Sequence, residues 1–407
     1  MIKLPQGWEV KKLGDIVEIQ IGKTPSRNNI DFFQGKNIWL SIRDLKSKFV
    51  SSSNEKISND AILKTNMKIV PKGTLLMSFK LTLGKTAFAD CDLYTNEAIA
   101  AIFIKDKNIN KYFLDYALKF ADLEKYVDNA VKGKTLNKQK LKQIEILLPS
   151  LKEQERIVGI LDEGFAKIDE SIKILEQDLL NLDELMQSAL QKAFNPLKDN
   201  AKENYKLPQG WEWKSLSEIA VTSSGGTPSR NKKEYWENGT IKWLKSGELN
   251  DGYISFIEEN ITQEAIENSS AKIFPKGTLL IAMYGATAGK LGILDLYSAT
   301  NQAICAFLHK NNKNIKFFEK FLFYFLFFIR DKIIKDSFGG AQPNISQTYI
   351  KNLQIPLPPL QEQEQIASYL DELSSHVKNL KQNYQMQIKN LQELKKFLLD
   401  KVFQGRL

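Results

Sequence analysis

The sequence is short of the residues that build metal centres, disulfide scaffolds and histidine-based active sites. Its 407 residues include 2 cysteines, Cys91 and Cys305, and 2 histidines, His309 and His376. Two cysteines exclude a disulfide framework and a cysteine-rich zinc module. So few histidines leave little for a metal site or a histidine-based catalytic triad. We therefore expect this chain to hold no metal.

Long apolar runs are also missing. The most apolar stretch, residues 321–329, is far shorter than the roughly 20 residues that cross a bilayer. The first ten residues, MIKLPQGWEV, lack the apolar core of a signal peptide. The sequence thus predicts a cytoplasmic protein with no membrane partner.

Nucleotide-binding and methyltransferase motifs are absent as well. The Gly-Lys-Thr triplets at 22–24, 84–86 and 133–135 lack the leading glycine of a phosphate loop, and no GxGxxG fingerprint occurs. There is no Asn/Asp-Pro-Pro-aromatic tetrapeptide of the kind a base methyltransferase uses. We predict that the chain is not an enzyme and has no catalytic residues.

Positive charge is in excess and unevenly placed. The formal net charge is +9. Basic side chains outnumber acidic ones in residues 1–148 and 205–357, whereas residues 149–204 are acidic. Basic globules joined to a neutral or acidic remainder are typical of proteins that bind nucleic-acid phosphates. A lysine excess that serves only solubility is the alternative on charge alone.

The chain repeats itself, which is the strongest signal in the sequence. Segments recur in the same order at an offset that grows from 203 to 209: KLPQGWEV (3–10) as KLPQGWEW (206–213), TPSRN (24–28) at 227–231, PKGTLL (71–76) at 275–280, and LKEQERIVGILDE (151–163) as LQEQEQIASYLDE (360–372). Chance matches would not stay collinear, so the chain is a tandem duplication.

Each copy divides into a globule and a long helix. Short β-rich runs punctuated by Gly, Pro, Asn and Asp predict mixed α+β globules. The predicted domains are 1–149 and 206–357 for the globules, 150–195 and 358–407 for the helices, and 196–205 for a linker. The aromatic cluster at 317–328 repeats the helical period of 112–120, so we interpret it as core and not as an exposed surface.

The two helices carry apolar heptads that predict a coiled coil. A capping box of Ser150 and Glu153 starts the first helix, and Asn195–Pro196 stops it. One narrow apolar seam per helix favours antiparallel pairing of the two. The seam residues that we expect to pair are Leu161, Ile168, Leu175, Leu182, Leu370, Val377, Tyr384 and Leu391.

In its motifs the chain resembles the DNA-specificity subunits of type I restriction–modification systems. Each copy opens with Leu-Pro-Gln-Gly-Trp-Glu, at 4–9 and 207–212, and continues with Thr-Pro-Ser-Arg. The second copy closes with Ile-Pro-Leu-Pro-Pro-Leu-x-Glu-Gln at 355–363, and the first, at 146–154, departs slightly from it with Ile-Leu-Leu-Pro-Ser. The resemblance spans essentially the whole chain.

This resemblance implies two target-recognition domains, each reading half of a split sequence in double-stranded DNA. Two antiparallel helices would space them and dock two methyltransferase subunits, and restriction and translocase subunits would join that assembly. The resemblance further implies that S-adenosylmethionine, ATP and Mg are bound by those partners, so that no cofactor belongs to this chain. The specificity chain of a type IIB-like system is a closely related alternative.

Residues shared by the copies serve what both halves do. Trp8 and Trp211 are shared, and we interpret them as core anchors before base-stacking residues. The Thr-Pro-Ser-Arg loop could place hydroxyls and a guanidinium on one phosphate, and a turn whose arginine pairs with a local acid is the alternative. The predicted DNA-backbone contacts are Thr24, Ser26, Arg27, Thr227, Ser229 and Arg230.

Residues that differ between the copies must carry any difference in target. They follow the Trp39–Leu40 and Trp243–Leu244 pairs and fill a second segment about 40 residues later. Arginine can bind guanine in a bidentate manner, and a carboxylate can accept a hydrogen bond from cytosine. The base-reading candidates are Arg43, Asp44, Lys80, Lys85, Lys245, Glu248, Tyr284, Thr287 and Lys290.

Two rival functions stay open at this point. One is a scaffold whose coiled coil tethers two protein-binding globules without any DNA role. The other is a two-headed transcriptional regulator that works without partner enzymes. Salt-dependent binding to random-sequence DNA would separate the first from a specificity subunit.

Overall fold

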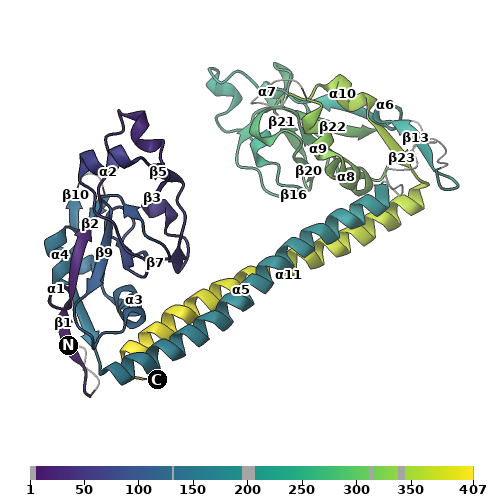
Figure 1. Ribbon diagram of the computed structural model, residues 1–407. Helices are drawn as coiled ribbons and strands as arrows, with labels where there is room; N and C mark the ends of the chain where they lie inside the picture. The colour runs from purple at the N-terminus through teal and green to yellow at the C-terminus, as the bar shows by residue number, and fades with distance from the viewer. Residues whose placement is uncertain (1–5, 131–132, 195–206, 311–315, 338–343, 407) are drawn as a thin grey trace. The chain divides into compact units, whose positions relative to one another are not determined.

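The computed structural model describes residues 6–130, 133–194, 207–310, 316–337 and 344–406. The chain divides into two compact units, unit 1 with Met1–Leu175 and Met386–Leu407, and unit 2 with Glu176–Gln385. Figure 1 shows that each unit combines a mixed α/β globule with parts of two long helices. The predicted linker 196–205 lies outside the described residues.

The globule of unit 1 is built on a five-stranded sheet of order β2-β9-β6-β7-β4 and a three-stranded sheet of order β5-β3-β8, while β1 pairs with β12. Its strands are β1 (Glu9–Lys12), β2 (Val17–Ile21), β3 (Asn37–Leu40), β4 (Phe49–Val50), β5 (Glu55–Ile57), β6 (Leu75–Ser78), β7 (Thr86–Ala89), β8 (Tyr94–Thr95), β9 (Ile99–Ile104), β10 (Asp128–Ala130), β11 (Gly133–Thr135) and β12 (Glu145–Leu148). Its helices are α1 (Leu13–Ile16), α2 (Asn59–Thr65), α3 (Lys111–Phe120) and α4 (Lys138–Gln143), with short 3-10 turns η1 (Ile30–Phe33), η2 (Ile42–Asp44) and η3 (Leu123–Tyr126).

The globule of unit 2 repeats this plan with a five-stranded sheet of order β14-β22-β19-β20-β16, a four-stranded sheet of order β17-β15-β21-β18, and the pair β13-β23. Its strands are β13 (Glu212–Ser215), β14 (Ala220–Ser224), β15 (Ile241–Leu244), β16 (Gly252–Ile254), β17 (Asn260–Ile261), β18 (Ile273–Phe274), β19 (Leu279–Ala282), β20 (Leu291–Leu294), β21 (Ser298–Thr300), β22 (Ile304–His309) and β23 (Gln354–Leu357). Its helices are α6 (Leu216–Ile219), α7 (Gln263–Glu267), α8 (Glu319–Phe328), α9 (Arg330–Lys335) and α10 (Gln347–Asn352), with 3-10 turns η4 (Lys233–Tyr235), η5 (Ser246–Glu248) and η6 (Gly285–Thr287).

The central sheet of each globule is covered on both faces, which explains its uninterrupted apolar strands. In β6, Leu75 and Met77 enter a core shared with α3 and α4, whereas Leu76 enters a second core on the other face. Successive side chains of a strand point to opposite faces, so both faces need apolar residues. In unit 2, Leu279 and Leu280 divide between two cores in the same way.

The aromatic cluster of the second copy is core, as its period indicated. Phe317, Phe321 and Phe325 are almost fully buried and belong to the main core of unit 2. Most of the cluster lies on α8, whose counterpart α3 buries Phe113 in unit 1. The same packing position is therefore filled in both copies.

Two helices of 44 residues each, α5 (Leu151–Phe194) and α11 (Leu360–Phe403), complete the chain. In unit 1, the start of α5 and the end of α11 enter one core, through Ile157 and Phe403. In unit 2, the end of α5 and the start of α11 share the core, through Phe194 and Leu370. Because the start of one helix lies with the end of the other in both units, the helices run antiparallel, as the heptads predicted.

Ion pairs between the helices agree with this direction. Asp169 pairs with Lys395 in unit 1, and Asp183 pairs with Lys381 in unit 2. From the first pair to the second, the α5 residue number rises by 14 and the α11 number falls by 14, as an antiparallel register requires.

Burial of the predicted seam is strongest next to the globules. Leu161, Ile168, Leu370 and Val377 are buried. The remaining four are half-buried: Leu175, Leu182, Tyr384 and Leu391. A pair of helices covers only one face of each seam residue, so burial is complete only where a globule adds a second layer. In the stretches of chain listed above, no helix combines the length and the apolarity that crossing a membrane would need.

Candidate nucleic-acid interface

The Thr-Pro-Ser-Arg loop has the same local structure in both units. Arg27 donates two hydrogen bonds to the carboxylate of Glu55, one of them from Nη2 to Oε2 at 3.0 Å. Its guanidinium lies over the rings of Phe33 and Trp39, at 4.3 and 5.2 Å from their centroids. The hydrogen bond from Arg27 lowers the pKa of the Glu55 carboxyl, so the pair is charged at neutral pH.

The equivalent loop of unit 2 has a similar arginine–glutamate ion pair and similar contacts with two rings. Arg230 Nη2 lies 2.7 Å from Oε2 of Glu259, and its guanidinium lies 3.7 Å from the ring centroid of Trp236. In both units the indole N–H of the neighbouring tryptophan holds the loop. Trp39 Nε1 donates to the carbonyl of Lys23 and Trp243 Nε1 to that of Gly226, both at 3.0 Å.

Of the six predicted backbone contacts, the two threonines and the two arginines have partners within the fold. Thr24 Oγ1 donates to Glu97, and Thr227 Oγ1 donates to Gln302. Ser26 and Ser229 are exposed, and the arginine side chains are 54% and 51% exposed. The two arginine–glutamate pairs match the alternative in which the loop is a turn whose arginine pairs with a local acid. About half of each arginine side chain is nevertheless exposed to solvent. Contact with a phosphate stays a prediction.

The first variable segment mixes structural and exposed residues. Asp44 accepts hydrogen bonds from the backbone N–H of Ser41 at 2.7 Å and of Asn54 at 2.9 Å, so its carboxylate is occupied by the turn η2. In unit 2, Glu248 accepts from the backbone N–H of Lys245 at 2.8 Å, and Lys245 Nζ donates to Glu259 at 2.6 Å. Arg43, in contrast, points to solvent from η2.

The second variable segment is the loop between β6 and β7 in unit 1 and between β19 and β20 in unit 2. Lys80 is half-buried with its Nζ 5.7 Å from the ring centroid of Phe79, whereas Lys85 is exposed. In unit 2, Tyr284 and Lys290 are exposed, and Thr287 is half-buried at the end of η6.

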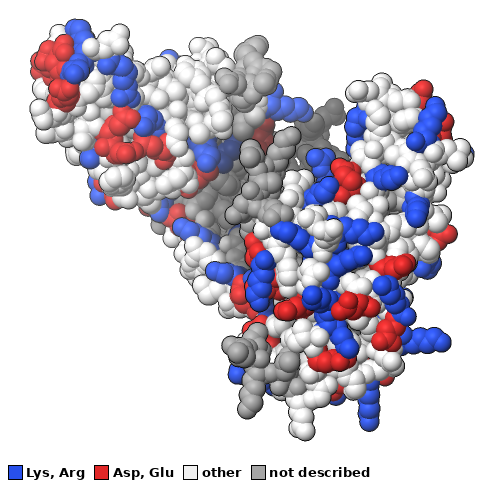
Figure 2. Space-filling view, turned by 90° about the vertical axis from the view of Figure 1, so that its left-hand side faces the viewer, with Lys and Arg blue, Asp and Glu red and all other residues white. Residues whose placement is uncertain are grey.

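In unit 1 the residues that follow the first variable segment and the β6–β7 loop border one hollow of about 930 Å³. The segment after η2 contributes Lys46 and Lys48, and the β6–β7 loop contributes Lys85. Lys119 of α3 also lines it and pairs with the buried Asp115 at 2.8 Å. Figure 2 shows the unit 1 globule with Lys and Arg side chains spread over its surface among Asp and Glu. Of the base-reading candidates in unit 1, Lys85 lines this basic hollow, whereas Arg43, Asp44 and Lys80 are not among its lining residues.

In unit 2 an arginine ties the corresponding segments together. Arg330, at the start of α9, donates to both carboxylate oxygens of Asp251, at 2.5 and 3.1 Å, and its Nε donates to the carbonyl of Gly289 at 2.9 Å. Asp251 follows η5, and Gly289 ends the β19–β20 loop. Arg330 was not among the residues predicted from the sequence, because nothing in its local pattern marks it.

Two polar contacts that attach each globule to its own helix were also not predicted from the sequence. Buried Gln154 donates to the carbonyls of Asn108 and Pro149, at 3.0 and 2.9 Å, and accepts from the N–H of Asn110 at 2.9 Å. Gln363 makes the equivalent contacts in unit 2. Both glutamines belong to the repeated Glu-Gln motif, and this repetition was the sequence signal for the contact.

The second contact is an aspartate about two turns further along each helix. Asp162 accepts from the hydroxyl of Tyr116 at 2.5 Å and from Lys48 Nζ at 2.6 Å. Burial and the bond to Asp162 raise the pKa of Tyr116. In unit 2, Asp371 accepts from Tyr324 at 2.8 Å and from Lys320. These contacts attach α3 to α5 in unit 1 and α8 to α11 in unit 2.

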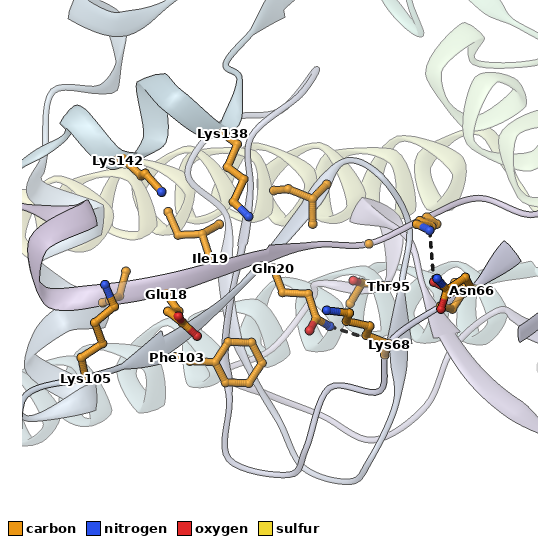
Figure 3. Close-up of a pocket in the computed structure, with 15 residues that line it drawn as sticks. Glu18, Ile19, Gln20, Asn66, Lys68, Thr95, Phe103, Lys105, Lys138 and Lys142 are labelled. Carbon is orange, nitrogen blue, oxygen red and sulfur yellow. Dashed lines mark hydrogen bonds between the residues drawn. The ribbon is translucent and has the colours of Figure 1, made fainter.

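A second hollow of unit 1, about 510 Å³, runs along β2 (Figure 3). Five lysines and Glu18 contribute to its lining, together with polar and apolar side chains; the lysines are Lys23, Lys68, Lys105, Lys138 and Lys142. None of these five lysines was predicted from the sequence as a site residue, although the chain's excess of lysine was evident from it. Throughout the described ranges, no group of three or more His, Cys, Asp or Glu side chains is arranged to hold a metal ion.

Comparison with known proteins gives consistent matches over the whole chain. The family model described as type I restriction modification DNA specificity domain matches residues 5–179 and again 208–390. The MjaIX specificity subunit of a type I restriction enzyme from Methanocaldococcus jannaschii is 26% identical over 100% of this chain and 94% of its own length. The EcoR124I/EcoR124II specificity subunit of Escherichia coli is 26% identical over 47% of this chain and 48% of its own.

Solved structures share the fold. A chain from a structure of the type I restriction–modification system, one that addresses complex assembly and conformational transition, aligns with a TM-score of 0.78 at 21% identity, over all of both chains. The HsdS subunit of Thermoanaerobacter tengcongensis aligns with a TM-score of 0.60 at 20% identity, over 100% of this chain and 98% of that one. These matches favour neither the coiled-coil scaffold nor the type IIB-like alternative.

Proposed function

The chain belongs to the type I restriction modification DNA specificity family, and we propose that it supplies sequence recognition to a complex whose catalysis resides in partner subunits. Each globule reads one half of a bipartite site in double-stranded DNA. The chain itself carries no active site.

The observation that carries this proposal is the division between repeated and variable contacts. The contacts of Gln154 and Asp162 recur in unit 2 at Gln363 and Asp371, so both globules are attached to their helices in the same way. The residues of η2 and of the β6–β7 loop differ in sequence from their counterparts, although Asp44 and Glu248 make the same capping contact. Two like scaffolds with unlike loops suit a target with two unlike halves.

The chemistry of the loops fits direct reading of bases. Arg43 is exposed on η2 and can offer two donors to guanine. The lysines that border the hollow of unit 1 can contact phosphates beside it, which positions the loops without reading sequence. This division of labour accounts for basic side chains around loops that differ between the copies.

The helices are proposed to dock the methyltransferase subunits. In unit 1, a hollow of about 640 Å³ between α5 and α11 is lined by Ile174, Leu175, Leu391 and Leu394 together with polar residues. Apolar side chains left exposed on a helix pair indicate a protein partner. The methyltransferase subunits hold S-adenosylmethionine, and restriction subunits with ATP and Mg join the assembly.

The decisive experiment combines binding with methylation. The chain, assembled with its methyltransferase subunits, should bind random-sequence duplex DNA with an affinity that falls steeply as salt rises. Sequencing of methylated sites in cells with and without the gene should reveal one bipartite motif that depends on it. A methylome that does not change on deletion of the gene would refute the proposal.

A further inference from the structure

One residue of the β6–β7 loop has a backbone conformation that its side chain opposes. Within the described parts of the chain, four non-glycine residues have positive φ: Asn66, Leu81, Asn238 and Asp251. Asn and Asp tolerate the left-handed region because their short polar side chains bond locally, whereas a leucine there brings its Cβ close to the backbone. Leu81, at φ 61°, is the one bulky apolar residue among the four.

The internal repeat shows that the fold does not need this leucine. The residue equivalent to Leu81 in unit 2 is Gly285, which has the same left-handed conformation with φ 74°. Both loops leave a buried strand and both end at a left-handed glycine, Gly84 and Gly289. Glycine adopts this conformation without strain, so a glycine at position 81 would fit the first loop better.

The leucine contributes little to the core either. Its residue surface is 70% exposed. Among the described leucines of the same globule, only Leu63 has a larger value, 78%, and it lies in the regular helix α2. Leu81 is thus unfavourable both in its backbone conformation and in the exposure of its apolar side chain, which points to a ligand for that side chain.

The loop holds Leu81 in place. Buried Ser78 donates from Oγ to the carbonyl of Thr82 at 2.5 Å and accepts from the N–H of Lys85 at 3.0 Å. The N–H of Gly84 donates to the carbonyl of Ser78 at 2.9 Å, and Lys80 forms a backbone bridge to Thr135. The side chain of Leu81 is therefore presented from a fixed loop, between two lysines.

We propose that Leu81 is a specificity-determining residue that contacts the C5-methyl group of a thymine in the first half-site. This inference rests on the proposed function and deepens it. The thymine methyl is the one apolar group on a base edge in the major groove, and apolar side chains recognise it by contact. Lys80 and Lys85 lie in the same loop and suit contacts with nearby phosphates. Unit 2, with Gly285, lacks this contact.

The test uses the full chain assembled with its methyltransferase subunits. Target sequences are first selected from a random-sequence duplex pool with the wild type, and each thymine of the selected first half-site is then replaced by uracil, which lacks the methyl. One replacement should weaken binding of the wild type by about three- to tenfold, the transfer value of one methyl group. The Leu81→Gly variant should lose the same factor on the thymine duplex and lose nothing further on the uracil duplex.

Controls separate this reading from loss of fold and from failure of the proposed function. Leu81→Gly should melt at the wild-type temperature or above it, and Leu63→Ala should select the wild-type sequence. A wild type that selects no sequence would refute the proposed function and this inference together. A first half-site without thymine, a variant with unchanged selection, or a uracil effect that persists in Leu81→Gly would refute the inference alone.

Discussion

The two units share their scaffold and differ in how their variable loops are held. In unit 2, Arg330 bonds to Asp251 and Gly289, so one side chain joins both loops. In unit 1, the position equivalent to Arg330 is Asp122, and the loops border a hollow lined by lysines. The comparison teaches that duplication kept the contacts between globule and helix while it allowed the contacts among the loops to diverge.

The contacts between globule and helix differ from those among the loops in how deeply their polar groups are buried. Gln154 and Gln363 pair buried backbone groups, and a buried group left unpaired costs about 1–3 kcal/mol. The loop residues are partly solvated, so water can replace a lost partner. Scaffold contacts are therefore constrained in both copies, whereas loop contacts are free to follow the ligand.

The largest effect should come from the aromatic residues that end the two helices. Phe403 packs on Trp8, Phe113 and Phe120 in unit 1, and Phe194 packs on Phe321 and Phe325 in unit 2. Replacing either by alanine leaves a cavity and should lower the free energy of unfolding of its own unit by about 3–5 kcal/mol. Calorimetry should show the altered unit melting first.

Phe397 is the matched control for these variants. It lies on the same helix as Phe403 and is 54% exposed, so Phe397→Ala should change the unfolding free energy by less than about 1 kcal/mol. If Phe403→Ala cost no more than this control, the end of α11 would not be part of the unit 1 core.

Arg330→Ala should remove the main difference between the units. The side chains of Arg330 and Asp251 are 19% and 24% exposed, so the variant leaves a largely buried carboxylate without its cation. We expect a loss of about 2–3 kcal/mol in the stability of unit 2, somewhat below the cost of breaking a fully buried pair. We also expect weaker discrimination between sequences at the second half-site and unchanged discrimination at the first.

Lys332→Ala tests whether charge alone explains such a result. Lys332 is exposed on the same helix, α9, and its removal should alter stability by about 0.5 kcal/mol or less. Equal effects of the two variants on urea unfolding would mean that Arg330 does not hold the loops.

A smaller and pH-dependent effect is expected at Asp162. Burial alone would raise the pKa of this carboxyl, but hydrogen bonds from Lys48 and Tyr116 outweigh it and hold the pKa below its ordinary value. A depressed pKa stabilises the folded state above the unfolded pKa of about 3.9, and the gain is lost as pH falls through the folded value. Asp162→Asn should cost about 1 kcal/mol at pH 7, after allowance for screening of a side chain that is 41% exposed.

Urea unfolding at pH 7 and near pH 3 checks this prediction. The difference between wild type and Asp162→Asn should shrink at the lower pH, because the wild-type carboxylate is then increasingly protonated. Glu170→Gln, an exposed position on α5, serves as the control for a lost helix charge. A difference that is the same at both pH values would assign the effect to shape and not to charge.

The sequence carried the fold further than the site. Heptads and the Ser150–Glu153 box predicted the first helix at 150–195, and it spans Leu151–Phe194, because capping and periodicity are local. The core position of Phe321 followed from its counterpart in the first copy. The pairing of Arg230 with Glu259 depends on how η4 and β17 meet, and no local pattern encodes that. The strain at Leu81 is visible only when its backbone is compared with that of Gly285.

The smallest expected effect on stability concerns the arginines that both units share. Arg27 and Arg230 each pair with a glutamate and lie over a tryptophan, and their side chains are about half exposed. Exposed ion pairs contribute about 0–1 kcal/mol, so Arg27→Ala should destabilise unit 1 only slightly. If the outward edge of the guanidinium binds a phosphate, the same variant should lower the slope of log affinity against log salt by about one. Glu55→Gln breaks the ion pair but keeps the cation, so it should leave the slope unchanged or raise it. A slope that falls equally in Arg27→Ala and Glu55→Gln would mean that the arginine acts only through Glu55 and the loop that they hold together.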